Sequence, residues 1–196
     1  MNHADPNARV LRVVFKEIVG GDRKKFSATS NESKTGGGAR DLRFRPSSIF
    51  EPAFEKLCPR TKMEPRRRNS TKSDTVVRVG TIAWFDQNGD VASDTFAVES
   101  PTDSRQGELR IAKVHQYPAF RRDLEPEPAR TVLLLIQRQD GSVWPEFRTE
   151  SDLRLPGWPP KLSGPILARL DATTKISSKG YRTRIAKGCV ELDGEQ

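Results

Sequence analysis

Glycines and cationic side chains gather in one stretch of the chain, residues 27–46. Three consecutive glycines occupy positions 36–38, where the backbone can take a positive φ or approach another molecule closely. Lys34, Arg40, Arg43 and Arg45 surround them with positive charge. A polar, turn-rich run ends in these glycines and continues into alternating basic and apolar residues. The combination predicts a loop that binds an anion.

The positive charge of the chain is concentrated in its first third. The whole chain carries 34 Lys and Arg against 26 Asp and Glu, a formal net charge of +8. Residues 1–72 hold 17 cations against 8 anions, a balance of +9, whereas residues 73–196 hold 17 against 18, a balance of −1. Such a concentration is typical of proteins that bind phosphate-rich partners, although it also serves as a solvated surface. Because the glycines lie in the same third, nucleic acid is the favoured partner.

Histidines and cysteines are too few for most metal sites and nucleophilic devices. The chain has two of each, His3, His115, Cys58 and Cys189, far apart in the sequence. Zinc sites need clustered ligands at set spacings, and a catalytic histidine would have to be His115. We therefore predict no catalytic residue, no metal site and no cofactor. Two cysteines make no disulfide framework and no signal-peptide pattern opens the chain, so we expect a reduced, cytoplasmic setting.

Acidic pairs that could hold the Mg²⁺ of a nuclease are scarce. Glu17 with Asp22 is one pair and Asp86 with Asp90 is another. The second pair brackets Asn88-Gly89, a hairpin signal that explains it without a metal. The glycine stretch also lacks the Gly-Lys-Ser/Thr ending of a phosphate-binding P-loop. Enzyme activity is not supported by these residues.

The elements that must position these residues are mostly short strands. In residues 108–114 we expect Leu109, Ile111 and Val114 on the core side and Glu108 and Arg110 facing out. No apolar run approaches the length of a membrane span. Patterns rich in β-branched and aromatic residues predict strands at residues 10–19, 24–27, 42–45, 76–85, 91–98, 108–114, 131–136 and 143–147.

One helix is predicted at residues 49–58, where apolar side chains recur at helical spacing. Ser48 with Glu51 is a capping-box pattern at its start, and Cys58 is expected to be a small buried residue at its end. Residues 161–172 are expected to form a second, short helix. Residues 60–74 are expected to be a solvated, mobile loop, and Arg66-Arg67-Arg68 in it could equally contact phosphate. The sequence thus predicts a mainly β chain with one or two short helices, a barrel or sandwich.

Three segments within residues 10–150 share their motifs and order with one known family. The first runs from Lys34-Thr35-Gly36-Gly37 through Phe44-Arg45-Pro46 to the helix near Ile49. The second joins residues 80–85 to the run 105–111, an Arg-x-x-Glu-x-Arg-Ile pattern, and the third pairs residues 131–136 with 143–147. Together they resemble the effector-binding N-terminal domain of EcoRII-type restriction endonucleases. That family belongs to the DNA-binding pseudobarrels, as do the DNA-binding domains of plant auxin-response transcription factors.

The resemblance implies an open seven-stranded pseudobarrel at residues 10–154, after a loose N-terminus at 1–9 and before an irregular, basic C-terminal extension at 155–196. Two loop arms would grip the major groove of DNA, the glycine stretch being the N-terminal arm and residues 103–113 the C-terminal arm. Where the family has a His-Gln pair, this chain has Gly38-Ala39, so we expect a different recognised sequence. About 45 residues follow the matched region, so we expect no linked nuclease domain.

Side chains of the second arm are the candidates for reading bases. Arg105 and Arg110 can each pair bidentately with guanine, and Gln106 or Glu108 can meet adenine or cytosine edges. For Glu108 an equal alternative is a salt bridge that orients Arg105 or Arg110.

Cations of the first arm, Lys34, Arg40 and Arg43, are better suited to backbone phosphates, which position a protein without reading sequence. The full set of DNA-binding candidates is Lys34, Thr35, Gly36, Gly37, Gly38, Arg40, Arg43, Ser104, Arg105, Gln106, Glu108, Arg110 and Lys113.

Three functions of different classes follow from these patterns. The favoured one is a sequence-specific double-stranded DNA-binding protein, a recognition module of a restriction or defence-type system that acts with a separate effector nuclease or other protein. The alternatives are a non-catalytic protein-interaction module whose basic third meets an acidic partner, and a small nuclease with an unrecognised site. No membrane partner is expected.

Overall fold

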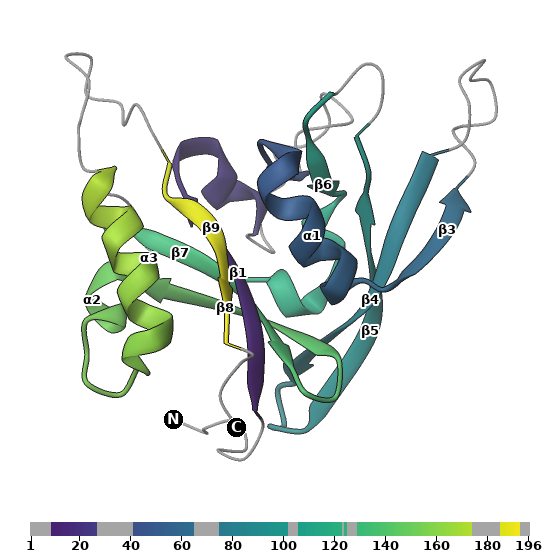
Figure 1. Cartoon of the computed structure of the whole chain (residues 1–196). Helices are drawn as coiled ribbons and strands as arrows, with labels where there is room; N and C mark the ends of the chain where they lie inside the picture. Colours follow the sequence, from purple (N-terminus) through teal and green to yellow (C-terminus); the bar gives the residue numbers. More distant parts are fainter. Residues whose placement is uncertain are drawn as a thin grey trace.

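The chain folds into one curled, open sheet with helices on both of its faces (Figure 1). The structure is a computed structural model that describes residues 9–26, 41–64, 75–101, 106–122, 124, 129–173 and 185–192. Its strands are β1 (Val10–Ile18), β2 (Leu42–Phe44), β3 (Arg60–Glu64), β4 (Thr75–Phe85), β5 (Val91–Glu99), β6 (Leu109–Ile111), β7 (Thr131–Arg138), β8 (Ser142–Thr149) and β9 (Lys187–Glu191). Its helices are α1 (Ser47–Leu57), α2 (Glu150–Leu153) and α3 (Pro160–Ala172), with 3₁₀ turns η1 (Gly20–Lys25), η2 (Val114–Gln116) and η3 (Pro118–Phe120). The predicted mainly β fold is confirmed.

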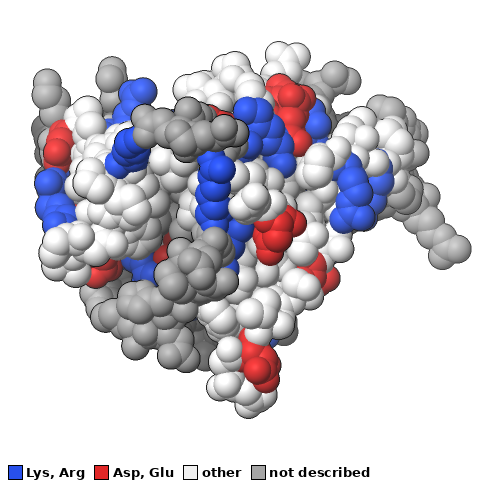
Figure 2. Space-filling view, turned by 60° about the horizontal axis from the view of Figure 1, so that its bottom comes forward, with Lys and Arg blue, Asp and Glu red and all other residues white. Residues whose placement is uncertain are grey.

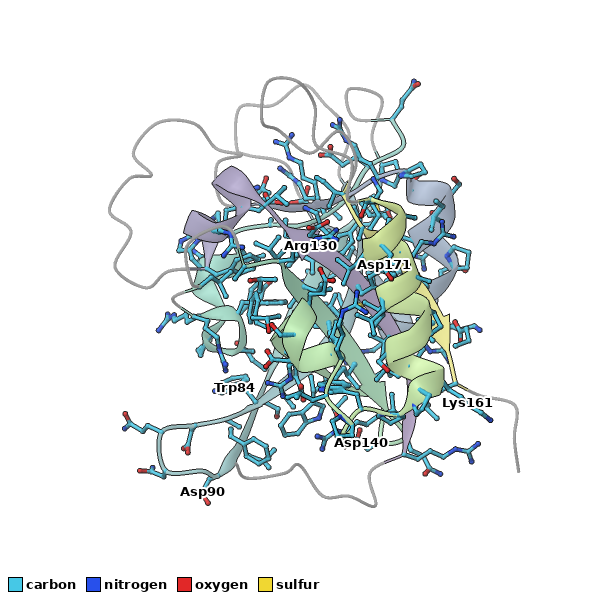
Figure 3. The ribbon with its side chains drawn as sticks, turned by 90° about the vertical axis from the view of Figure 1, so that its left-hand side faces the viewer. Trp84, Asp90, Arg130, Asp140, Lys161 and Asp171 are labelled. Atoms are coloured by element: carbon cyan, nitrogen blue, oxygen red, sulfur yellow. The ribbon has the colours of Figure 1, made fainter. Side chains whose placement is uncertain are left out.

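The strands follow the spatial order β2-β6-β5-β4-β8-β7-β1-β9, and β3 pairs with β4 outside this path. Both predicted hairpins are confirmed, since β4 pairs antiparallel with β5 and β7 with β8. The two hairpins meet through a short parallel contact in which Thr81 lies opposite Ser142. The β4–β5 hairpin projects from the body of the molecule, with Asp90 at its tip (Figure 3).

Two hydrophobic clusters hold the layers together, one on each face of the sheet. Neighbouring residues of β1 show the division, because Val14 packs into the first cluster and Val13 into the second. Helix α1 fills the concave face, where Phe50 and Phe54 meet Phe44 of β2 at ring-centroid distances of 5.3 and 4.9 Å. Helices α2 and α3 cover the other face. The packing of α1 against Phe44 fixes the position of β2, which carries part of the candidate site.

The C-terminal part of the chain, expected to be irregular, contains α3 and β9 in its described residues. Strand β9 pairs with β1 from Arg12 to Lys16, so it belongs to the same sheet. A buried ion pair connects α3 to β1. Arg130 contacts Glu17 of β1 at 2.9 and 3.1 Å and donates to the carbonyl of Leu170 in α3 at 2.8 Å. Figure 3 shows Arg130 beside α3. Glu17 Oε2, one of the two oxygens that contact Arg130, also accepts the Ala186 N–H. Nine strands are described, against the seven expected.

Three local predictions are wrong. Lys24 and Lys25, expected to start the short strand 24–27, belong to η1, where Lys25 contacts Asp22 and the distant Asp41 carbonyl. Residues 60–64 form β3 because β4 offers them a five-residue antiparallel edge. The capping box does not form, since the N-cap of α1 is Pro46 and it makes no side-chain cap hydrogen bond. The predicted second helix at 161–172 and the burial of Cys58 are confirmed.

Candidate nucleic-acid interface

The residues that flank the two predicted loop arms lie on neighbouring strands. Strand β2 follows the first loop, strand β6 follows the second, and the two pair antiparallel with Arg43 opposite Arg110. Leu42 and Phe44 face the core, as do Leu109 and Ile111 on β6. Because side chains alternate along a strand, the charged side chains of both strands fall on the other face. The two arms are separated by more than sixty residues in the sequence, yet both adjoin the same pair of strands. We call this β2–β6 pair, with the residues that precede each strand, the root of the two loops.

Asp41, the residue between the first loop and β2, is buried and accepts three contacts. Its Oδ2 lies 2.5 Å from Arg110 Nη1, its Oδ1 accepts the Lys113 N–H at 3.1 Å, and its backbone carbonyl accepts Lys25 Nζ at 2.8 Å. Lys25 lies just before the first loop, so its ammonium group joins the two ends of that loop. Lys25 also contacts Asp22.

Arg110 connects this aspartate to the second loop. Its Nε donates to Glu99 Oε2 at 2.7 Å, and Glu99 is the last residue of β5 before that loop begins. Burial alone lowers the pKa of Arg110, but hydrogen bonds and charges from Glu99 and Asp41 outweigh it, so the pKa lies above its usual value. Arg110 is thus fixed as a cation between two carboxylates, where we expected it to face out.

Glu108 forms a second ion-pair cluster at the other end of the β2–β6 ladder. Its side chain is 0% exposed, whereas those of Arg43 and Arg45 are 43% and 60% exposed. Arg45 Nε donates to Glu108 Oε2 at 2.5 Å, and Arg43 Nε lies 3.5 Å from Glu108 Oε1. Among the described residues Oε1 accepts no hydrogen bond. The outward orientation predicted for Glu108 is wrong, since the carboxylate is buried beneath two arginines that extend into solvent.

The exposed groups around these roots are cationic or neutral. Arg43, Arg45 and Lys113 extend from the β2–β6 pair, and Gln106 is exposed just before β6. Arg122, whose N–H donates to the Phe26 carbonyl at 2.9 Å, is exposed beside the start of the first loop. We call these five residues the loop-root surface. Among the described residues the nearby carboxylates, those of Asp22, Asp41, Glu99 and Glu108, are 15%, 2%, 20% and 0% exposed, so the exposed charge of this described surface is mainly positive.

The structure describes five of the thirteen predicted site residues. Arg43, Gln106 and Lys113 are exposed, Arg110 is held in ion pairs and Glu108 is buried. The salt bridge that was one of the two alternatives for Glu108 forms with Arg43 and Arg45 and not with Arg110. Its other expected partner, Arg105, lies outside the described residues. The remaining candidates lie outside the described residues: Lys34, Thr35, Gly36, Gly37, Gly38, Arg40, Ser104 and Arg105.

The sequence patterns did not identify several residues of this cluster as site residues. Arg45 carried a usable signal, because it stands two residues after Arg43 and so lies on the same face of the strand. Asp41, Glu99 and Lys25 carried none, since their contacts depend on pairing between strands far apart in the sequence.

Other residues that could have done chemistry are engaged in the fold. Asp86 Oδ1 accepts the N–H groups of Asn88 and Asp90 at 2.8 and 3.0 Å, the hairpin role expected of it. Burial raises the pKa of the Cys58 thiol to about 12 and, together with the charge of Glu191, that of Cys189 to about 11, so both stay protonated at neutral pH.

Within the described ranges, no three His, Cys, Asp or Glu side chains converge on a point that could hold a metal ion.

On the face seen in Figure 2, basic and acidic side chains are interspersed among uncharged ones. None of the helices in the described part of the chain is long and apolar enough to cross a membrane. The cytoplasmic setting stays a prediction.

Comparison of the chain with protein-family models, curated proteins and solved structures found no match. The resemblance to EcoRII-type effector-binding domains therefore stays a prediction that rests on the sequence motifs.

Proposed function

We propose that this chain binds double-stranded DNA, in a sequence-dependent manner, through the loop-root surface and the two loops that leave it. The chain would act as the recognition module of a restriction or defence-type system, and a separate effector protein would supply any chemistry. One observation carries the proposal: at the shared root of two basic loops, carboxylates are buried and cations are exposed.

This arrangement suits a phosphate backbone for an electrostatic reason. An exposed ion pair presents little net field, whereas a buried carboxylate under exposed guanidinium groups keeps the arginines oriented and leaves their outer donors to the ligand. Arg43 and Arg45 share Glu108 in this way. Contacts from such cations position a protein on the duplex, and polar side chains such as Gln106 can then meet base edges.

Selection of duplexes from a random pool, followed by binding measurements at several salt concentrations, tests the proposal. We expect a preferred sequence bound in the nanomolar range, about 10⁻⁸ M, with affinity that falls steeply as salt rises. Arg43→Ala should weaken all sequences alike and reduce the salt slope by about 1, because it removes one phosphate contact. Arg169→Ala, an exposed arginine of α3 on the other face of the sheet, is the matched control and should leave both unchanged.

Two results would exclude this function. Failure of the wild-type protein to bind any duplex at about 50 mM salt, where phosphate contacts are strongest, is the first. An equal effect of Arg43→Ala and Arg169→Ala on the salt slope is the second, because it would make the binding a property of net charge alone. Binding of an acidic protein partner that duplex DNA fails to displace would favour the interaction module. Cleavage of supercoiled plasmid with Mg²⁺ would favour the nuclease.

A further inference from the structure

Arg110 holds the roots of both loops at once. It follows the second loop, contacts Glu99 before that loop, and contacts Asp41 at the end of the first loop. We propose that Arg110 is a positioning residue that fixes the two loops relative to each other and does not contact DNA bases. This inference rests on the proposed function, since it concerns the organisation of the same surface.

All three guanidinium nitrogens of Arg110 already contact carboxylates. Nε and Nη2 face Glu99 and Nη1 faces Asp41, so a bidentate contact to guanine would have to share nitrogens that two carboxylates already hold. The side chain is also only 15% exposed. If the guanidinium turned away from Asp41 to reach a base, Asp41, 2% exposed, would remain buried without its cation.

Asp41 extends the connection to four chain segments. Besides Arg110, its carboxylate accepts the N–H of Lys113, whose backbone is held in the left-handed region at φ 50°. Its carbonyl accepts Lys25 Nζ from the residue pair that precedes the first loop. Both ends of the first loop and both ends of the second are therefore tied to one pair of residues, Asp41 and Arg110, with Lys25 bound to the Asp41 backbone carbonyl. Loosening that pair would free the described ends of the two loops to move relative to each other without removing any exposed cation.

Substitution of Asp41 by asparagine separates the two roles of Arg110 by the sign of its effect. If Arg110 contacted bases, Asp41→Asn would release its guanidinium and remove a negative charge, so duplex binding would stay equal or improve. If Arg110 positions the loops, Asp41→Asn and Arg110→Gln each weaken the selected duplex by about tenfold, a typical coupling between linked sites. Binding to an unrelated duplex, which depends on phosphate contacts, should stay within about twofold. The double variant should be no weaker than the weaker single one.

Arg154 offers a matched control. Like Arg110 it bridges two carboxylates, Glu150 and Asp171, each at 2.7 Å, but it lies on the α2–α3 side of the molecule. Arg154→Gln should leave both binding constants unchanged. A second readout needs no DNA: hydrogen exchange at the Lys113 amide and along β2–β6 should quicken at least about tenfold in Asp41→Asn and Arg110→Gln, and stay unchanged in Arg154→Gln. Thermal unfolding of each variant verifies that it is folded. If a single variant does not fold, the double Asp41→Asn/Arg110→Gln variant, in which neither residue is charged, takes its place.

The outcomes are distinct. Selected-duplex binding that stays equal or improves in Asp41→Asn but is lost in Arg110→Gln overturns the positioning role and restores base contact. Unchanged hydrogen exchange in both variants overturns it as well. If the wild-type protein binds no duplex while exchange quickens in both variants, the proposed function fails and the coupling of the two loop roots stands.

Discussion

Removal of Arg45 should destabilise the fold more than removal of the carboxylate that Arg45 contacts. Glu108 is fully buried, whereas the Arg45 side chain is 60% exposed. Arg45→Ala leaves a buried carboxylate with Arg43 as its nearest cation, 3.5 Å away, and breaking a buried pair in this way costs about 3 kcal/mol. Glu108→Gln leaves only arginines that can turn into water, so it costs about 1 kcal/mol. The double variant should also cost about 1 kcal/mol, because no unpaired buried charge remains.

Urea unfolding followed by tryptophan fluorescence measures this asymmetry. The sum of the single costs exceeds the expected cost of the double variant by about 3 kcal/mol, which is the interaction energy that the cycle should return. In thermal unfolding, about 2–4 °C per kcal/mol for a chain of this size places the midpoint of Arg45→Ala about 6–12 °C below wild type. Equal costs for Arg45→Ala and Glu108→Gln, or a double variant that costs the sum of both, would refute the burial argument.

Two further predictions concern packing and pH. Gly80→Ala should cost about 3 kcal/mol of stability in the same urea assay, because a Cβ there would lie 2.7 Å from the Leu57 carbonyl oxygen. The control Gly157→Ala, at a position with open space around it, should change stability by less than about 1 kcal/mol. Hydrogen bonds from the backbone N–H and the side chain of Thr149, the N-cap of α2, hold the pKa of Asp152 below its usual value. The contribution of Asp152 to folding stability is therefore present above about pH 4 and is lost as pH falls through the lowered pKa. Asp152→Ala should therefore cost about 1 kcal/mol at pH 7 and much less at pH 2, and an equal cost at both would contradict the assignment.

Periodicity and turn signals were enough to predict the large elements. A run rich in β-branched and aromatic residues located β1, and the Asn88-Gly89 turn located the β4–β5 hairpin. Helix α1 followed from its apolar face. These are local patterns, in which the residues that determine the element also form it. Strand β3 was missed because residues 60–64 lack such a pattern and adopt extended structure only beside β4.

Side-chain roles at the candidate site depend on contacts that no local pattern encodes. Glu108 and Arg110 alternate with Leu109 and Ile111, so alternation predicted both charged residues to face solvent. Both instead meet opposite charges brought by distant segments: Glu108 meets the arginines of β2 and its neighbour, and Arg110 meets Asp41 and Glu99. The sequence identifies which residues are charged. Which opposite charges lie next to each other depends on the order of the strands in the sheet.

Net charge therefore describes this surface less well than the placement of its anions. The first 72 residues carry eight carboxylates besides their seventeen cations, and a uniform mixture of the two would present a weak field. Asp41 is buried against Arg110, and Glu108 is buried beneath Arg43 and Arg45. Each buried carboxylate orients cations without facing a ligand itself, so the field at the loop roots is more positive than composition implies. For this reason Glu108→Gln and Asp41→Asn, which leave every cation in place, are sharper tests of the site than substitution of lysines and arginines.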